Sequence, residues 1–218
     1  SRLREEYAAR CTEQRANHAS VAEVAELVED LTFYPFFAWL ERHLQIAKYA
    51  GRYGLAPYYA ERRETVLHDI DTVPAGDPIL ELHPELPMPD YYRATDIHQH
   101  PGGVWSDDTA GLVYEHGARS TTPLLGASHA DLHTRFTEKV MSEGEVSHVL
   151  DMGCGFGKST MPFALLSPKV EIKGVDLAAP CLRVAAHTAR SKGCTNVRFK
   201  QAHAAQTGYE DGSFDLVT

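Results

Sequence analysis

The sequence predicts an α/β fold in which a parallel, doubly wound sheet follows a helical N-terminal region. After residue 146, short apolar segments alternate with amphipathic ones, which indicates strands joined by helical crossovers. Residues 2–70 show the apolar spacing of helices instead. Residues 148–157 place three glycines directly after an apolar run that ends in an acid, as in the strand-to-helix turns of nucleotide-binding sheets.

The composition narrows the class of protein. Of the 218 residues, 43% are hydrophobic and 23% are charged, which is ordinary for a globular protein, and we find no apolar run of membrane-spanning length. The net charge of −9 argues against a nucleic-acid partner, which would need a clustered positive field. Four cysteines without CxxC spacing and no secretory signal favour a cytoplasmic protein with reduced thiols and no membrane partner.

The first 70 residues are expected to form several helices. Ser20 is a good N-cap, and Glu23 stands three residues later as its capping-box partner. The helical apolar pattern that begins at residue 33 is expected to stop at Gly51 or Gly54, and residues 57–70 predict a further helix. The aromatic stripe "FYPFFAWL" is interpreted as core or as the contact of a homodimer, not as a ligand site.

The middle of the chain is less regular. Residues 72–90 are rich in proline and predict a connector, not a helix or a central strand. Residues 91–127 combine glycines and aromatic side chains without a clear period, which favours an irregular lid. A helix is expected at 128–144, capped by Ser128 and ended by Gly144. The predicted domains are residues 1–90 (helical region and connector), 91–145 (lid or acceptor-pocket segment and lead-in helix) and 146–218 (core).

The core is expected to contain four strands and two helices in alternation. The predicted strands are 146–153, 170–176, 196–202 and 214–218, and the predicted helices are 158–167 and 179–193.

The stretch "HVLDMGCGFGKST" (148–160) admits three kinds of nucleotide site. The ATP loop GxxxxGK[ST] requires a glycine where the chain has Met152. The dinucleotide pattern GxGxxG requires its third glycine at Lys158 or Thr160. What remains is an acid at a strand end followed by GxGxG.

The sequence resembles class I S-adenosylmethionine (SAM)-dependent methyltransferases in three features. These are the strand-end acid with its GxGxG loop, a second acid after the second core strand, and "DGSFDLV" at 211–217. The resemblance covers about residues 146–218. It implies a Rossmann-like sheet, SAM as cofactor, S-adenosylhomocysteine as product, and methyl transfer to a small molecule. Such sheets usually have seven strands and this one is truncated after its fourth, so we expect its remainder from residues beyond 218 or from another chain.

The resemblance also implies a set of cofactor contacts. Glycines let the backbone approach SAM closely, and Asp151 can help hold the cationic methionyl head. Asp176, 19 residues after Gly157, can accept hydrogen bonds from both ribose hydroxyls, with Leu177 along the adenine. The predicted cofactor-binding residues are Asp151, Gly153, Cys154, Gly155, Gly157, Ser159, Asp176, Leu177, His203 and Ala204.

The chain departs from the family pattern at the part of this site that is expected to hold the adenine base. His203 stands where the family usually carries Asp, and a neutral imidazole accepts a hydrogen bond only through its unprotonated nitrogen. The backbone of Ala204 can still serve the adenine edge. Ser159 can reach the SAM carboxylate at the positive end of the helix.

His98 and His100 are the candidate catalytic residues, because a neutral imidazole is an available general base near pH 7. Two alternatives stay open: loop histidines bonded to backbone, or metal ligands together with Asp96, Glu115 or His116. We assign no metal.

The predicted function is SAM-dependent methylation of a small-molecule oxygen, nitrogen or activated carbon, in natural-product metabolism. The alternatives are a non-catalytic SAM-binding scaffold and an NAD-dependent reductase.

Overall fold

The computed structural model describes residues 2–14, 20–71, 73–74, 76–96, 100, 102–120 and 129–218. The chain divides into two compact units, residues 1–47 and 48–218. The two boundaries between the three domains expected from the sequence, after residues 90 and 145, do not coincide with this division and stay predictions. No described helix is long and apolar enough to cross a lipid bilayer.

The first unit contains α1 (Arg2–Gln14), α2 (Val21–Glu29) and most of α3 (Phe33–Tyr49). The predicted capping box is confirmed: Ser20 Oγ accepts the Glu23 N–H at 3.3 Å, and the Glu23 carboxylate accepts the Ser20 N–H at 2.5 Å. The helix α3 ends two residues before Gly51, as its glycine predicts.

The second unit begins with α4 (Leu55–Glu61) and α5 (Arg63–Ile70), where the sequence predicts one helix. That prediction is wrong in one respect, because the helix breaks at Arg62, whose φ of −113° and ψ of 14° leave the helical range. There the Arg62 guanidinium donates to the Tyr58 carbonyl at 3.1 Å, in place of the backbone N–H that a continuous helix would use.

The expectation of an irregular lid over 91–127 is also corrected. This stretch contains most of α6 (Asp90–Ala94) and all of α7 (Ala110–Ser120), while residues 121–128 lie outside the described part. In the sequence, the glycine at position 111 favours a loop over a helix. In the structure this glycine lies inside α7, and a Cβ at Gly111 would lie 2.2 Å from the Pro180 carbonyl oxygen. Glycine is therefore required by close packing of α7 on α10 (Ala179–Ser191), which no local pattern reveals.

The remaining helices follow the predictions. They are α8 (His129–Met141), α9 (Thr160–Leu166) and α10. The predicted cap of α8, Ser128, lies outside the described residues.

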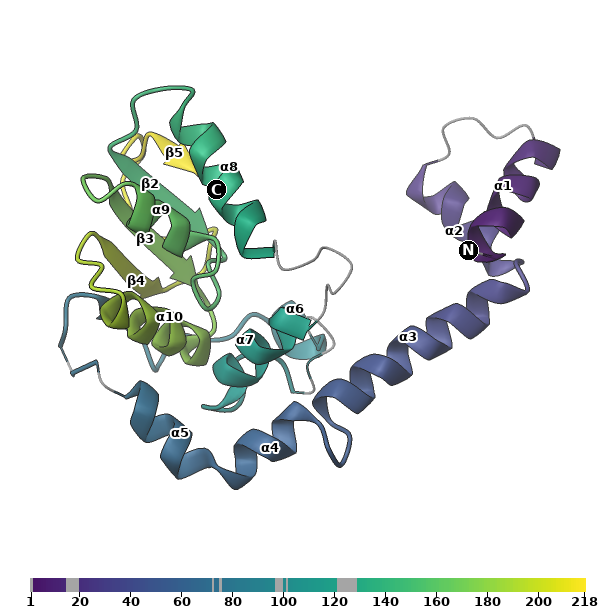
Figure 1. Ribbon diagram of the computed structural model, residues 1–218, viewed down its shortest axis with the longest axis horizontal. Coiled ribbons are helices and arrows are strands. Elements are labelled where there is room, and N and C mark those ends of the chain that lie inside the picture. Colours follow the sequence, from purple (N-terminus) through teal and green to yellow (C-terminus); the bar gives the residue numbers. More distant parts are fainter. Residues whose placement is uncertain are drawn as a thin grey trace. The chain divides into compact units, whose positions relative to one another are not determined.

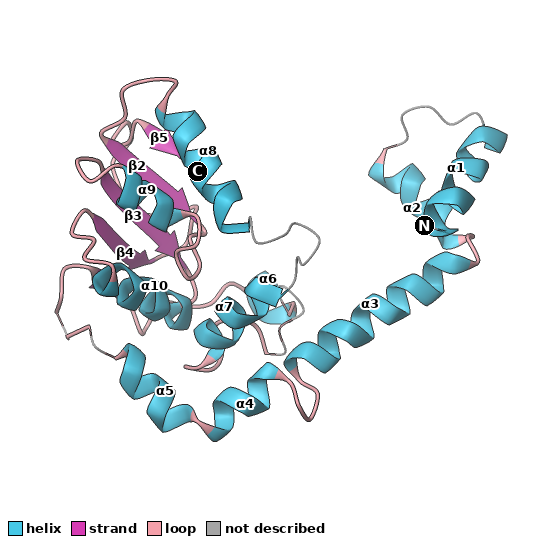
Figure 2. Cartoon of the chain, viewed as in Figure 1, coloured by secondary structure: helices cyan, strands magenta, loops and turns pink. Residues whose placement is uncertain are grey.

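One parallel sheet runs through the second unit, in the strand order β1-β4-β3-β2-β5 (Figures 1 and 2). Its strands are β1 (Leu80–Glu81), β2 (His148–Met152), β3 (Glu171–Asp176), β4 (Val197–Gln201) and β5 (Leu216–Val217). The four predicted strands are confirmed, but the described sheet has a fifth, β1, inside the proline-rich connector. An edge strand tolerates neighbouring prolines because only one side must pair; here the Ile79 carbonyl accepts the Phe199 N–H at 2.7 Å.

The main core lies between one face of the sheet and the helices α8, α9 and α10, where Phe163, Leu182 and Phe199 are buried. The opposite face carries a smaller cluster, in which Tyr209 and Phe214 cover Leu150 and Val175. Because β2, β3 and β4 are parallel, their carboxyl ends meet at one edge, where the loops that follow them come together.

Candidate functional site

The glycine loop follows β2 at the carboxyl edge of the sheet. Gly153, Gly155 and Gly157 have φ values of +81°, +51° and +82°, which side chains with a Cβ rarely adopt. The backbone N–H groups of Gly153 and Cys154 donate to the Val175 carbonyl at 2.7 and 3.1 Å. These two bonds tie the loop to the end of β3.

The three glycines serve different purposes. A Cβ at Gly157 would lie 3.1 Å from the Ala185 Cβ, so this position lets the loop pack against α10. Among the described residues, a Cβ at Gly153 would meet no heavy atom within 4 Å, and one at Gly155 would meet only the Tyr114 ring, at 3.7 Å. The space above these two glycines is therefore open to a ligand.

Cys154 turns its side chain away from that space. Its thiol is buried in the main core, and burial raises its pKa well above the ordinary value. Only its backbone belongs to the loop surface. A Cβ at Gly174 on β3 would lie 2.9 Å from the Cys154 Sγ, so a small residue is needed there, which the sequence reasoning missed.

Asp151 is buried at the end of β2 with 4% of its surface exposed. Its Oδ2 accepts hydrogen bonds from the Ser159 hydroxyl at 2.7 Å and the Thr160 hydroxyl at 2.6 Å. The Thr218 hydroxyl contacts Oδ1 at 3.4 Å. The carboxylate thus fixes the start of α9, and the predicted contacts of Asp151 and Ser159 with a methionyl head stay predictions.

Asp176 ends β3 and reaches back to the glycine loop. Its Oδ2 accepts the Gly155 N–H at 2.9 Å and its Oδ1 accepts the Ala178 N–H at 2.8 Å. Burial raises the pKa of Asp176, while the N–H groups of Ala178 and Gly155 act in the opposite direction. Each oxygen keeps a further lone pair, so the carboxylate can accept two hydroxyl groups from one ligand.

The next residue, Leu177, has 9% of its surface exposed and is held by a side chain that sequence reasoning missed. The buried amide of Gln201 donates to the Leu177 carbonyl at 3.0 Å and accepts the His83 N–H at 3.0 Å. One amide therefore joins the ends of β1, β3 and β4. The sequence signal was the alternation in β4, which puts Gln201 on the same face as the apolar Val197 and Phe199.

His203 and Ala204 lie in a tight turn after β4. The Gln206 N–H donates to the His203 carbonyl at 2.8 Å, and the Ala205 N–H donates to the His203 Nδ1 at 2.9 Å. The Nε2 of the same ring is 3.0 Å from the Tyr91 hydroxyl oxygen. The turn thus forms the β4 side of the site, and Tyr91 of α6 lies beside it.

The sequence model of the family described as "Methyltransferase domain" matches residues 149–218. This part of the chain is similar to methyltransferase domains, as its sequence motifs predict. The matched residues begin in β2 and include the glycine loop, Asp176 and the β4 turn.

Several curated relatives match part of the chain. The chain is 39% identical over 95 residues to the uncharacterized methyltransferase YcgJ of Bacillus subtilis, covering 37% of this chain and 36% of that protein. It is 35% identical over 71 residues to nocamycin O-methyltransferase of Saccharothrix syringae, covering 32% and 25%. It is 34% identical over 89 residues to ribosomal RNA small subunit methyltransferase G of Bacteroides thetaiotaomicron, covering 41% and 42%.

The crystal structure of YcgJ from Bacillus subtilis aligns with a TM-score of 0.34 at 34% identity, covering 39% of this chain and 36% of that one. The chain thus spans between a quarter and less than half of the length of these curated relatives.

SAM is the cofactor that the match to methyltransferase domains implies, and the residues at the carboxyl edge fit it. The open space above Gly153 and Gly155 admits a ligand without phosphates, and the Asp176 carboxylate suits a pair of ribose hydroxyls. A pyrophosphate on the glycine loop would be repelled by the Asp151 carboxylate at the end of β2.

Aromatic side chains from the segment before β2 lie beside the glycine loop. Tyr92 and Trp105 pack against the same small buried cluster as Phe156 of the glycine loop, and the Tyr114 ring lies edge-on to Phe156 at 5.1 Å. Burial raises the pKa of Tyr114 to about 12, and burial together with the Asp176 charge raises the pKa of Tyr92. Both phenols therefore stay protonated at neutral pH and act as hydrogen-bond donors, not as bases.

Of the two candidate bases, the structure describes only His100. His98 lies outside the described residues. His100 is 4% exposed, and its ring lies 5.2 Å from the Tyr49 ring. Its role as a base stays a prediction.

The candidate metal ligands have other partners. Asp96 accepts the Gly102 N–H at 3.0 Å, Glu115 pairs with Arg119, and His116 Nδ1 is 3.2 Å from the Tyr59 hydroxyl. Among the residues that the structure describes, no group of three potential metal ligands comes together.

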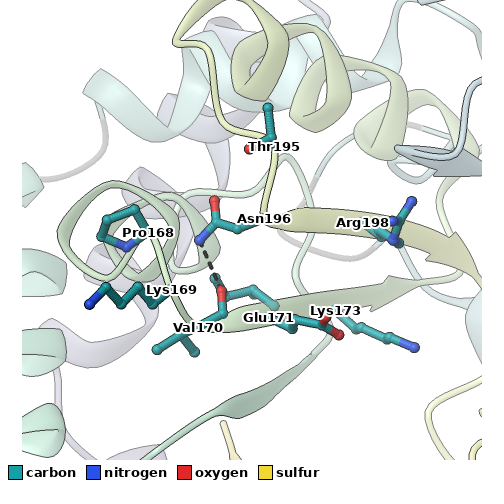
Figure 3. Close-up of a pocket in the computed structure, with 9 residues that line it drawn as sticks. Pro168, Lys169, Val170, Glu171, Lys173, Thr195, Asn196 and Arg198 are labelled. Carbon is teal, nitrogen blue, oxygen red and sulfur yellow. Dashed lines mark hydrogen bonds between the residues drawn. The ribbon is translucent and has the colours of Figure 1, made fainter.

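A cavity of about 230 Å³ lies at the opposite end of the strands, between the starts of β3 and β4 (Figure 3). The Asn196 amide closes one side of it by donating to the Val170 carbonyl at 2.9 Å. In Figure 3 the side chains of Lys169 and Arg198 point away from each other, so the cations do not converge on one ligand. This cavity is separate from the cofactor site.

Proposed function

We propose that the protein transfers a methyl group from SAM to an oxygen, a nitrogen or an activated carbon of a small molecule. The observation that carries the proposal is the Asp176 carboxylate, held by Gly155 and Ala178 N–H groups beside an open glycine loop. Bound SAM supplies an electrophilic methyl group on a sulfonium, so positioning of the acceptor contributes much of the rate.

The chain's own residues would orient the cofactor and exclude water. Asp176 would accept the ribose hydroxyls, and the glycine loop would let the backbone lie against the ligand. The aromatic side chains of Tyr92, Tyr114 and Phe156 would shield the site, because their rings pack together beside the loop. An acceptor hydroxyl or acidic carbon also needs a base, and we propose His98 or His100 for it.

The net charge of the chain favours a small molecule over RNA as the methyl acceptor. The relatives include proteins named as a nocamycin O-methyltransferase and as ribosomal RNA methyltransferases. RNA binding relies on a positive surface that neutralises phosphates, whereas this chain carries a net charge of −9. We therefore propose an acceptor from natural-product metabolism.

Binding and turnover measurements separate this function from its alternatives. SAM and S-adenosylhomocysteine are expected to raise the melting temperature by mass action, and NAD is not. Transfer of a labelled methyl group from SAM to members of a small-molecule panel is then expected. Stabilisation by NAD would favour a reductase, and SAM binding with a sterically closed acceptor side would favour a scaffold domain.

The candidate bases are tested by replacing them one at a time. His98→Ala or His100→Ala is expected to lower kcat while the affinity for S-adenosylhomocysteine is kept, provided that the acceptor requires deprotonation. Because His100 is buried against Tyr49, its variant also needs a melting curve. Full activity of both variants at neutral pH would contradict the assignment.

We also propose a homodimer and a cytoplasmic location. Phe36 and Trp39 of α3 are 51% and 54% exposed, and large apolar side chains at a surface favour association. Light scattering after gel filtration should give twice the 24.1 kDa mass, and Trp39→Glu should give the monomer mass. All four cysteines are free thiols, which fits a reducing compartment.

A further inference from the structure

Both ring nitrogens of His203 are engaged. The Ala205 N–H donates to Nδ1 at 2.9 Å, so Nδ1 is unprotonated and the neutral ring carries its proton on Nε2. That Nε2–H faces the Tyr91 hydroxyl oxygen at 3.0 Å. The tautomer of this histidine is therefore set by the backbone of its own turn.

This pair lies where the base of a bound nucleoside is expected. The Ala202 N–H donates to the Asp176 carbonyl at 3.1 Å, so the end of β4 directly adjoins the end of β3. A ribose held by the Asp176 carboxylate points its base along the sheet edge, either toward β4 or away from it. Leu177 and the 202–206 turn offer the apolar contact and the backbone groups that a purine needs, which favours β4.

We propose that His203 is a specificity-determining residue that makes the cofactor site insensitive to the 6-amino group of the adenine. The proposal rests on the proposed SAM-binding function. An exocyclic amino group is a hydrogen-bond donor and is read by an acceptor. In this turn the acceptor nitrogen of His203 is used by Ala205, and the other nitrogen is a donor that Tyr91 occupies. The imidazole therefore offers the amino group no acceptor.

The substitution His203→Asp tests this idea because it supplies what the imidazole lacks. One carboxylate oxygen can keep the bond from the Ala205 N–H, as aspartates do in tight turns, while the second accepts the amino group. We would titrate the protein and this variant with S-adenosylhomocysteine and with its 6-deamino analogue, in which a hydrogen replaces the amino group and N1 of the purine stays an acceptor. Isothermal calorimetry gives the ratio of the two affinities for each protein.

For the native protein the two affinities are expected to lie within about threefold of each other, since no hydrogen bond to the side chain at 203 is lost. In His203→Asp the preference for S-adenosylhomocysteine is expected to rise about tenfold or more, as for a gained charge-assisted hydrogen bond. Tyr91→Phe should keep the native ratio, because the Ala205 N–H still occupies Nδ1.

Three results would overturn the inference. The first is a native preference above about tenfold that His203→Ala removes, since the imidazole would then read the amino group. The second is a native ratio that persists in a folded His203→Asp, and the third is a ratio that changes in Tyr91→Phe. A native protein that binds neither compound would instead contradict the proposed function.

Discussion

The Asp176 carboxylate accepts the backbone N–H of Gly155 at 2.9 Å, which joins the end of β3 to the middle of the glycine loop. The bond needs the left-handed backbone of Gly155, with its φ of +51°, and a carboxylate at the strand end. Of the two bonded groups only the Asp176 carboxylate is charged, and this carboxylate lies beside the open space above the loop. The same acid therefore shapes the loop and remains able to bind a ligand.

Replacing Asp176 with Ala should weaken SAM binding by about 1–3 kcal/mol, because two ribose hydroxyls lose their charged acceptor. Calorimetry with S-adenosylhomocysteine measures the change, and a melting curve reports the loss of the Gly155 and Ala178 bonds. Asp211→Ala, on the exposed loop after β4, is the matched control and should bind as the native protein does. Unchanged affinity in a folded Asp176→Ala would contradict the ribose role.

SAM affinity should depend on pH through Asp176. Its pKa is raised above 3.8 by burial, so the carboxylate is protonated at a higher pH than an exposed aspartate. Ribose hydroxyls donate to the ionised form, so affinity is full above the raised pKa and falls as the pH drops through it. Calorimetry from neutral pH downward checks this, and Asp176→Asn should remove that part of the dependence. An affinity that rises on acidification would have the wrong sign.

Gly111→Ala should lower the free energy of unfolding by about 1–3 kcal/mol, as for overpacking of a core. The added Cβ would lie 2.2 Å from the Pro180 carbonyl oxygen and would push α7 away from α10. Gly144→Ala is the control, since a Cβ there meets nothing within 4 Å. Denaturant unfolding of both variants gives the comparison, and equal stabilities would contradict the described packing.

Thr160→Val should cost about 1.5–3 kcal/mol of unfolding free energy, because a hydrogen bond to a charged group is lost while the shape is kept. The Thr160 hydroxyl donates to the buried Asp151 carboxylate at 2.6 Å. A double-mutant cycle with Asp151→Asn measures the coupling between the two. Additive effects of the two substitutions would show that the bond contributes nothing.

The sequence alone located the loop, the acid after β3 and the alternation of strands and helices. These features are local: a strand is an apolar run, a glycine at positive φ has few substitutes, and the spacing from Gly157 to Asp176 is one helix and one strand. Patterns of this kind involve residues that are close together in the sequence, so they can be recognised without the structure. They also identified the class of the domain.

The tertiary structure decided what depends on residues far apart in the chain. The helix α7 is held by a glycine that fits only against Pro180, and β1 exists only because β4 lies beside it. The ring nitrogens of His203 are assigned by Ala205 and Tyr91, the latter 112 positions away. Packing and hydrogen bonding between distant segments have no period in the sequence, so only the folded chain reveals them.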